Sequence, residues 1–213
     1  MPKLAVHDGV VHVESNDILE YLDALPSPFD PFMPQSDAER RIVKASLDRE
    51  DSLHMELRNL TMGFILPRRL MQKSEETLQR WECEGAADPK RTLEVIWWRD
   101  FARRGVPADA ARGSFKAFAA AFAELDETLS KQAWLIGGRI SVLDVAWFID
   151  VHRVGLAGYP VERHPHVAQW HRHLSARPAF AKEIQAPAPV AALMALYATY
   201  RRLRGASLRD IAA

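Results

Sequence analysis

The stretch that decides the fold is WLIGGRISVLDVAWFIDVHRV, residues 134–154. Ser141 followed by Asp144 forms an S-x-x-D capping box, in which each side chain satisfies a backbone N–H that the start of a helix leaves unpaired. Ile140 and Val145 occupy the two positions of a hydrophobic staple around this box. The residues that follow are apolar on almost every side, which predicts a helix at the centre of the core from Ser141 to about 154.

The chain on both sides of this stretch is also helical in pattern. Residues 36–66 predict one long helix that begins at the polar cap SDAE and that Pro67 ends or kinks. Phenylalanine and leucine recur every three or four residues from Phe115 to Leu129, which predicts another buried helix. Shorter helices are expected over 165–174 and 178–184, and a helix that begins with proline and stops at Gly205 follows them.

The N-terminal residues have a different pattern. Two valine-rich runs, 3–7 and 10–13, flank Asp8-Gly9, which is a strong β-hairpin signal because both residues tolerate positive φ. A helix is expected from Ser15 to about Leu25, with Ser15 as its N-cap. LPSPFDPFMP (25–34) contains four prolines in ten residues, and we interpret it as a linker.

Composition narrows the class of protein. Lys+Arg and Asp+Glu both number 28, so the formal net charge of zero gives no electrostatic footprint for nucleic acid or an anionic membrane. The single cysteine, Cys83, cannot form an internal disulfide, which fits a reducing compartment. The sequence has no apolar run near the roughly 20 residues that span a bilayer. We therefore expect a cytoplasmic protein that binds neither nucleic acid nor membrane.

Three stretches together resemble the glutathione S-transferase superfamily. VESNDILEYLD (13–23) before the proline linker resembles the glutathione-binding end of that family's thioredoxin-like domain. Residues 134–154 and HPHVAQWHRHLSARPAF (164–180) resemble its helical domain, with Trp170, Leu174, Arg177 and Pro178 as a spaced motif. The resemblance runs from Met1 to about Ile184.

The resemblance implies a glutathione site at the start of the chain. Glu14-Ser15 matches the pair that holds the γ-glutamyl end of glutathione: Ser15 offers a hydroxyl and a backbone N–H at a helix N-terminus, and Glu14 can pair with the α-ammonium group. Ser15 could instead be an N-cap and nothing more. Pro2 matches the family's cis-proline, and Met1 matches the residue whose backbone pairs with the cysteinyl part of glutathione.

The resemblance also points to a missing element. Family members have a strand, a helix and a strand before this point, with a Tyr, Ser or Cys there that activates the glutathione thiol. Such a unit takes roughly 30 residues or more, so we expect the sequence to start after it and the chain as given to be inactive. Cys83 lies in the helical part, cannot be carried over as that residue and is interpreted as a bystander. No catalytic residue is assigned.

Substrate residues are expected on the helix that borders the cleft in the family. His54, Arg58 and Met62 follow one another at helical spacing and are the candidates; a solvated mixed face is the alternative. Trp97-Trp98 and Arg99 could line a cleft, although core and surface contacts are the commoner role. The long segment 71–109 and the tail after 184 resemble the layout of the bacterial dehalogenating and aryl-ether-cleaving branch, which favours aromatic substrates.

Histidine spacing argues against a metal site. His164 and His166, like His171 and His173, are two apart and diverge by about 200° on a helix. His166 and His173 share a face, but a tetrahedral site needs more ligands. We expect no metal.

We therefore predict a mainly α fold: a partial thioredoxin-like hairpin and helix (1–25), a proline-rich linker (26–35), a helical C-terminal domain (36–184) and a helical extension (185–213). The complete form is expected to bind glutathione as cosubstrate, to transfer its thiolate to an apolar, possibly aromatic, electrophile, and to form a homodimer. A non-catalytic helical binding or assembly module of the same fold is the alternative.

Overall fold

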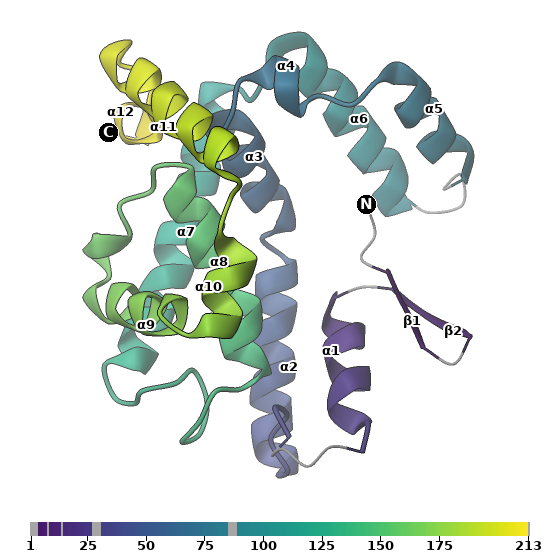
Figure 1. The fold of residues 1–213 in the computed structure, drawn as a ribbon, viewed down its shortest axis with the longest axis vertical. Coiled ribbons are helices and arrows are strands. Elements are labelled where there is room, and N and C mark those ends of the chain that lie inside the picture. The colour runs from purple at the N-terminus through teal and green to yellow at the C-terminus, as the bar shows by residue number, and fades with distance from the viewer. Residues whose placement is uncertain (1–3, 8, 14, 27–30, 85–88, 213) are drawn as a thin grey trace. The chain divides into compact units, whose positions relative to one another are not determined.

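The structure is a computed structural model that describes residues 4–7, 9–13, 15–26, 31–84 and 89–212 (Figure 1). Apart from one two-stranded hairpin, the regular elements of the described residues are helices, so the prediction of a mainly α fold is confirmed. None of the helices among the described residues has the length and apolar character required to cross a membrane.

The N-terminal elements are those that the sequence predicts. Strands β1 (Leu4–His7) and β2 (Val10–Val13) pair antiparallel, with Leu4 opposite Val13. Gly9 in the turn has φ +76°, which a residue with a Cβ rarely adopts. Helix α1 (Ser15–Ala24) contacts β2 through Tyr21, whose ring stacks on His12 and whose hydroxyl lies 2.5 Å from Nδ1 of His7.

The chain divides into two compact units. The first contains residues 1–54, 121–152 and 161–181, and the second contains residues 55–120, 153–160 and 182–213. Helices α7 (Ala108–Leu129) and α8 (Val142–Leu156) contribute residues to both units. The predicted boundaries at 25, 35 and 184 stay predictions.

In the first unit, the start of α8 is fixed by one buried carboxylate. Asp144 accepts hydrogen bonds from the backbone N–H and the hydroxyl of Ser141 at 2.9 and 2.8 Å, from the N–H of Leu135 at 3.1 Å and from the indole N–H of Trp170 at 2.8 Å. The last contact joins α8 to α9 (Pro165–Ser175). Trp147 of α8 is buried and donates to the hydroxyl of Ser46. The expected central helix is therefore present, with the predicted carboxylate at its start.

Other contacts hold α9 and the linker in the same unit. Asp126 accepts the N–H groups of His166 and Val167 at 2.8 and 2.9 Å, which satisfies donors at the start of α9. The backbone of Phe32 donates to Asp23 and accepts from the N–H of Val142. The remaining elements of this unit are η1 (Val161–Arg163) and most of α10 (Pro178–Ile184).

The prediction of one continuous helix over 36–66 is wrong at its middle. Two helices form instead: α2 (Asp37–Asp51) and α3 (His54–Phe64). The hydroxyl of Ser52 donates to the carbonyl of Arg49 at 2.6 Å, and the N–H of Leu53 bonds to the carbonyl of Glu50, three residues back. Serine competes with the helical ladder in this way, and bonds of this shorter kind tighten and end the last turn.

The second unit is built on an α-helical hairpin. Helices α5 (Glu75–Glu84) and α6 (Pro89–Arg104) follow the short helix α4 (Arg68–Met71). Their buried core consists of Leu78, Val95, Trp98 and Phe101, with half-buried apolar residues packed around it. Arg99 joins the hairpin through ion pairs with Glu75 on α5 at 2.8 Å and with Glu82 at 2.9 Å.

The C-terminal helices of this unit are tied to α3. Arg201 on α11 (Ala188–Leu203) donates to the carbonyl of Gly63 at 2.9 Å, and its guanidinium lies 4.3 Å from the ring centroid of Phe64. It also donates to the carbonyl of Ala206, just before α12 (Leu208–Ala212). Leu208 is 1% exposed. The C-terminal extension is therefore part of the packed unit.

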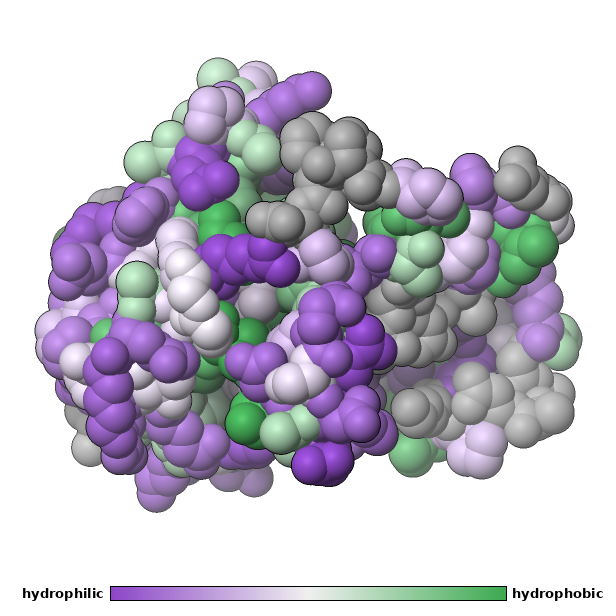
Figure 2. All heavy atoms as spheres, turned by 90° about the horizontal axis from the view of Figure 1, so that it is seen from below, coloured by the Kyte–Doolittle hydropathy of each residue, from purple (hydrophilic) through white to green (hydrophobic). Residues whose placement is uncertain are grey.

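The visible surface is of ordinary polarity. Figure 2 shows a face on which hydrophilic residues cover most of the area and hydrophobic residues appear as separate patches. Scattered apolar side chains of this kind are normal on a folded protein.

Candidate functional site

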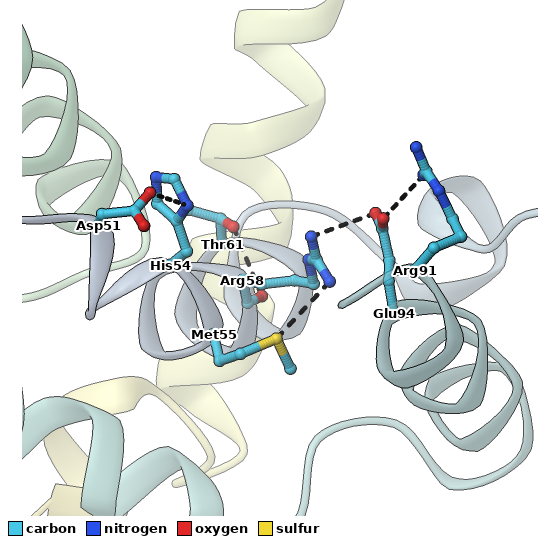
Figure 3. Close-up of polar contacts among 7 residues, drawn as sticks. All are labelled: Asp51, His54, Met55, Arg58, Thr61, Arg91 and Glu94. Atoms are coloured by element: carbon cyan, nitrogen blue, oxygen red, sulfur yellow. Dashed lines mark hydrogen bonds and ion pairs between the residues drawn. The ribbon is translucent and has the colours of Figure 1, made fainter. Parts of the chain in front are cut away.

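The candidate site lies in the second unit, where α3 faces α6. Arg58 on α3 reaches Glu94 on α6, with 3.2 Å between Nη2 and Oε1, and Arg91 holds the other oxygen of Glu94 at 2.9 Å (Figure 3). The three side chains are 19–24% exposed. Because two guanidinium groups share one carboxylate, this group carries one unit of net positive charge.

An aromatic ring extends the same group. The guanidinium of Arg58 lies 5.6 Å from the ring centroid of Trp97, a cation–π distance. The indole N–H of Trp97 donates to Oδ1 of Asn59 at 2.9 Å, and the amide of Asn59 donates to the hydroxyl of buried Ser114 at 3.0 Å. The polar end of the ring is therefore fixed, which sets the orientation of its flat face.

Met62 lies one turn after Arg58 on α3 and contributes apolar surface. It is half-buried against the core of Leu78, Val95, Trp98 and Phe101, and Trp97 is half-buried against the same core. A thioether is polarizable and adapts to ring edges. The site therefore combines a thioether, an oriented indole and a half-buried cation, which suits an aromatic ligand.

The charge of Arg58 is affected by its surroundings. Burial lowers the pKa of the Arg58 guanidinium, Glu94 opposes that shift and Arg91 adds to it. The ordinary pKa of arginine is so high that the group stays charged at neutral pH. The site thus offers a permanent cation that is only partly hydrated.

His54 has a different setting from Arg58 and Met62. It belongs to the first unit, where its ring nitrogens lie 3.2 Å from Asp51 and 3.6 Å from Glu50. The hydrogen bond to buried Glu50 raises the pKa of His54, against the effect of burial. The structure therefore shows a histidine paired with carboxylates at the start of α3.

The other residues singled out in the sequence have defined places. Trp98 is a core residue, and Arg99 joins α5 to α6 by ion pairs, as described above. Cys83 is exposed near the end of α5. Met1, Pro2 and Glu14 lie outside the described residues, and of Ser15 the structure gives the backbone, which begins α1. Those glutathione residues stay predictions.

The histidines take part in local contacts. His166 pairs with Asp126, with 3.1 Å between Nδ1 and Oδ2, and His171 stacks on Phe148 and His152. Burial is the main cause that lowers the pKa of His171 to about 4. Within the described ranges, no group of three or more His, Cys, Asp or Glu side chains is placed to hold a metal ion.

Comparison with known proteins gives the class. The family model for the C-terminal domain of glutathione S-transferases matches residues 108–173, which include the capping box and most of α9. Protein LigF of Sphingobium sp. strain NBRC 103272 / SYK-6 is 30% identical over 186 residues, which is 81% of this chain and 69% of LigF. The chain therefore belongs to the glutathione S-transferase superfamily, as the sequence motifs predicted.

Solved structures agree with this class. The crystal structure of the beta-etherase LigF has a TM-score of 0.66 and 26% identity, and the match covers 84% of this chain and 74% of LigF. A glutathione S-transferase from Rhodospirillum rubrum F11 has a TM-score of 0.56 at 17% identity, with 87% of this chain and 71% of the other covered. At 17% identity, the match to the Rhodospirillum rubrum structure shows a shared fold and no more.

Sequence reasoning missed four residues of this site: Asn59, Arg91, Glu94 and Ser114. Apart from the pair of Arg91 and Glu94, which are three residues apart, the contacts that these residues make in the site join side chains 36–55 residues apart. The available signal was the three-residue spacing of Arg91, Glu94 and Trp97, which places them on one face of α6. This spacing does not indicate which helix packs against that face.

Proposed function

We propose that this protein is a glutathione transferase that acts on an apolar, aromatic electrophile. The observation that carries the proposal is its 30% identity, over 186 residues, with LigF, a protein that the solved structure names a beta-etherase. The oriented Trp97 ring, Met62 and the Arg58 cation support the aromatic class, because they offer stacking and cation–π contacts.

Glutathione is proposed to bind at the N-terminus of α1. Ser15 would hold the γ-glutamyl carboxylate with its hydroxyl and backbone N–H, Glu14 the α-ammonium group, and the backbone of Met1 before Pro2 the cysteinyl part. The start of α1 at Ser15 supports this, because the first N–H groups of a helix favour an anion.

The proposed reaction is a displacement by sulfur. The glutathione thiol loses its proton, the thiolate attacks an electrophilic carbon to form a C–S bond, and the leaving group departs with the electron pair of the bond that breaks. The thiolate is the reactive form, and a free thiol has a pKa of about 8.5. Met62 and Trp97 would hold the ring of the electrophile, Arg58 would face its π-electrons or its departing oxygen, and His54 stays a candidate by its place on α3.

Steady-state conjugation of glutathione to a panel of aryl ethers and aryl halides tests this, with the protein as its gene encodes it. Arg58→Ala and Met62→Ala should each raise KM for the electrophile about tenfold, the effect of one lost contact of about 1.4 kcal/mol, with KM for glutathione unchanged. Arg80→Ala, an exposed arginine on α5, and Met71→Ala, a half-buried methionine on the same core, are the matched controls.

A KM for the electrophile that is the same in Arg58→Ala and Arg80→Ala would refute the assignment of the site. Absence of conjugation by the purified protein, with every electrophile tested, would favour the non-catalytic binding module. A homodimer in the cytoplasm is part of the same proposal, and sedimentation of the purified protein tests its subunit number.

A further inference from the structure

The two arginines that share Glu94 carry more positive charge than this carboxylate balances. Arg58 binds Oε1 of Glu94 at 3.2 Å, and Arg91 binds Oε2 at 2.9 Å (Figure 3). In the part of the chain that the structure describes, neither arginine has a second carboxylate partner. One positive charge therefore remains without a counter-charge, and the proposed reaction assigns no substrate contact to Arg91.

Another group of the same composition on α6 differs in its contact with water. Asp100 is shared by Arg103 and Arg104, whose side chains are 77% and 65% exposed. Water therefore solvates the charge that Asp100 does not balance. Arg58 and Arg91 are 24% and 20% exposed, so water reaches them much less. A charge that is partly buried without a partner costs free energy, and an anion from a ligand would remove that cost.

Both arginines keep N–H donors available for such an anion. Each guanidinium has five N–H donors, and no oxygen atom of the described residues other than those of Glu94 accepts from Arg58 or Arg91. Each guanidinium also lies against an indole: Arg58 is 5.6 Å from the ring centroid of Trp97, and Arg91 is 5.2 Å from that of Trp81. The rings and the shared carboxylate thus hold two guanidinium groups whose remaining donors are open.

The position of Arg91 on α6 also favours an anion. Arg91 lies in the first turn of this helix, which contains no acidic residue. The helix dipole gives this end a positive potential, which disfavours a cation and favours an anion. The charge of Arg91 and the end of the helix therefore attract the same kind of ligand.

We propose that the electrophile is an aromatic acid whose carboxylate binds to Arg91 and to the open donors of Arg58. This inference rests on the proposed function, because it concerns the same substrate. The carboxylate balances the remaining charge, and its hydrogen bonds to guanidinium are charge-assisted. Arg91 precedes Trp97 by six residues, about 9 Å along the helix axis. A carboxylate on the second of two linked rings spans that separation when the first ring lies on Trp97.

Isothermal titration with 4-phenoxybenzoate and the uncharged 4-phenoxybenzamide, at the physiological ionic strength of about 0.15 M and without glutathione, tests the site apart from the reaction. The wild type should bind the acid about tenfold more tightly than the amide, the effect of one hydrogen bond to a charged group. Arg91→Gln should bring this ratio close to one. Glu94→Gln should raise the ratio above that of the wild type, because it removes the carboxylate that competes for the same donors.

The exposed group at Asp100 supplies matched controls. Asp100→Asn and Arg104→Gln change the net charge as Glu94→Gln and Arg91→Gln do, but at a hydrated place, so both should keep the wild-type ratio. A second readout locates the ligand: the indole N–H resonance of Trp97, assigned with a Trp97→Phe variant, should shift when the acid is added.

Four binding results would overturn the inference. These are a ratio near one in the wild type, a ratio that Arg91→Gln leaves unchanged, a Trp97 resonance that stays fixed while another tryptophan moves, and equal changes in Glu94→Gln and Asp100→Asn. The last result would show attraction by overall charge.

Conjugation of glutathione to 4-chloro-3-nitrobenzoate and to its amide separates this inference from the proposed function. We expect a higher kcat/KM for the acid. Equal kcat/KM values for the two compounds would refute the aromatic acid while the transferase stands. Absence of conjugation, together with tighter binding of the acid in the titration, would refute the transferase while the carboxylate site stands.

Discussion

Replacement of Asp144 by alanine should be among the most destabilising single changes in the first unit. The carboxylate is fully buried and accepts four hydrogen bonds, from the backbone and hydroxyl of Ser141, the N–H of Leu135 and the indole of Trp170. Alanine leaves these donors without an acceptor and leaves a small cavity. The variant also loses the cap of α8.

The magnitude follows from those contacts. Each buried donor left without a partner costs roughly 1–3 kcal/mol, and the lost cap costs about 1 kcal/mol. Part of this is offset, because the variant no longer keeps a charge out of water. We expect Asp144→Ala to lower the free energy of unfolding by about 3–5 kcal/mol, at the upper end of single-site effects.

Asp144→Asn separates the charge from the shape. One amide oxygen can still accept from Leu135 and Trp170, whereas the amide NH₂ would face the donors of Ser141. Asp144→Asn should lower the free energy of unfolding by roughly 2 kcal/mol, which is less than the loss expected for Asp144→Ala. Asp37→Ala, which removes an exposed carboxylate from the first turn of α2, is the matched control and should cost less than about 1 kcal/mol.

Urea unfolding followed by circular dichroism at 222 nm and by tryptophan emission measures these differences. The order should be Asp37→Ala, then Asp144→Asn, then Asp144→Ala, from the smallest loss to the largest. An Asp144→Ala midpoint that coincides with the Asp37→Ala midpoint would refute the role given to the four hydrogen bonds. An Asp144→Asn variant as stable as the wild type would refute the role given to the charge.

Three further predictions concern charged residues. Arg201→Ala should speed amide hydrogen exchange in α3 and α11, because the carbonyl of Gly63 loses its donor; unchanged exchange there would contradict this. The pKa of His54 is raised, so its pairing stabilises the fold below about pH 6.5. This contribution is lost as pH rises through the folded-state pKa. The difference in the free energy of unfolding between the wild type and His54→Gln should therefore shrink from pH 6 to pH 8. Burial alone would raise the pKa of Asp126, but the N–H groups of α9 outweigh burial and lower that pKa. The wild type should therefore be more stable than Asp126→Asn above about pH 4, and this difference should fade as pH falls through the folded-state pKa. For His54 or for Asp126, a stability difference that is constant with pH would refute the role given to that residue.

Local features were predictable from the sequence because a few adjacent residues determine them. The hairpin followed from Asp8-Gly9 between two valine runs, and the start of α8 followed from Ser141 and Asp144, which are three residues apart. The turn and the cap form within the reach of one or two peptide units, so no distant part of the chain has to be known.

Features that depend on distant residues were not predictable in the same way. The break after α2 is a balance between the helical ladder and one serine hydroxyl, Ser52, and helix periodicity does not register such a balance. Trp170 is 26 residues from Asp144, and Glu94 is 36 residues from Arg58. Helical spacing placed Arg58 and Met62 on one helix but gave no information on which helix would face them.

The contact between Arg201 and Gly63 sets a limit on how far the chain can be shortened. Gly63 is next to the last residue of α3, where carbonyl groups have no partner within the helix. The donor for this carbonyl comes from 138 residues further along the chain. A truncation at Ile184, where the likeness in sequence motifs stops, would leave that helix end open and expose the surface that Leu208 covers. The smallest fragment expected to refold with an intact second unit therefore extends to residue 212, well beyond the segment 108–173 that the family model matches.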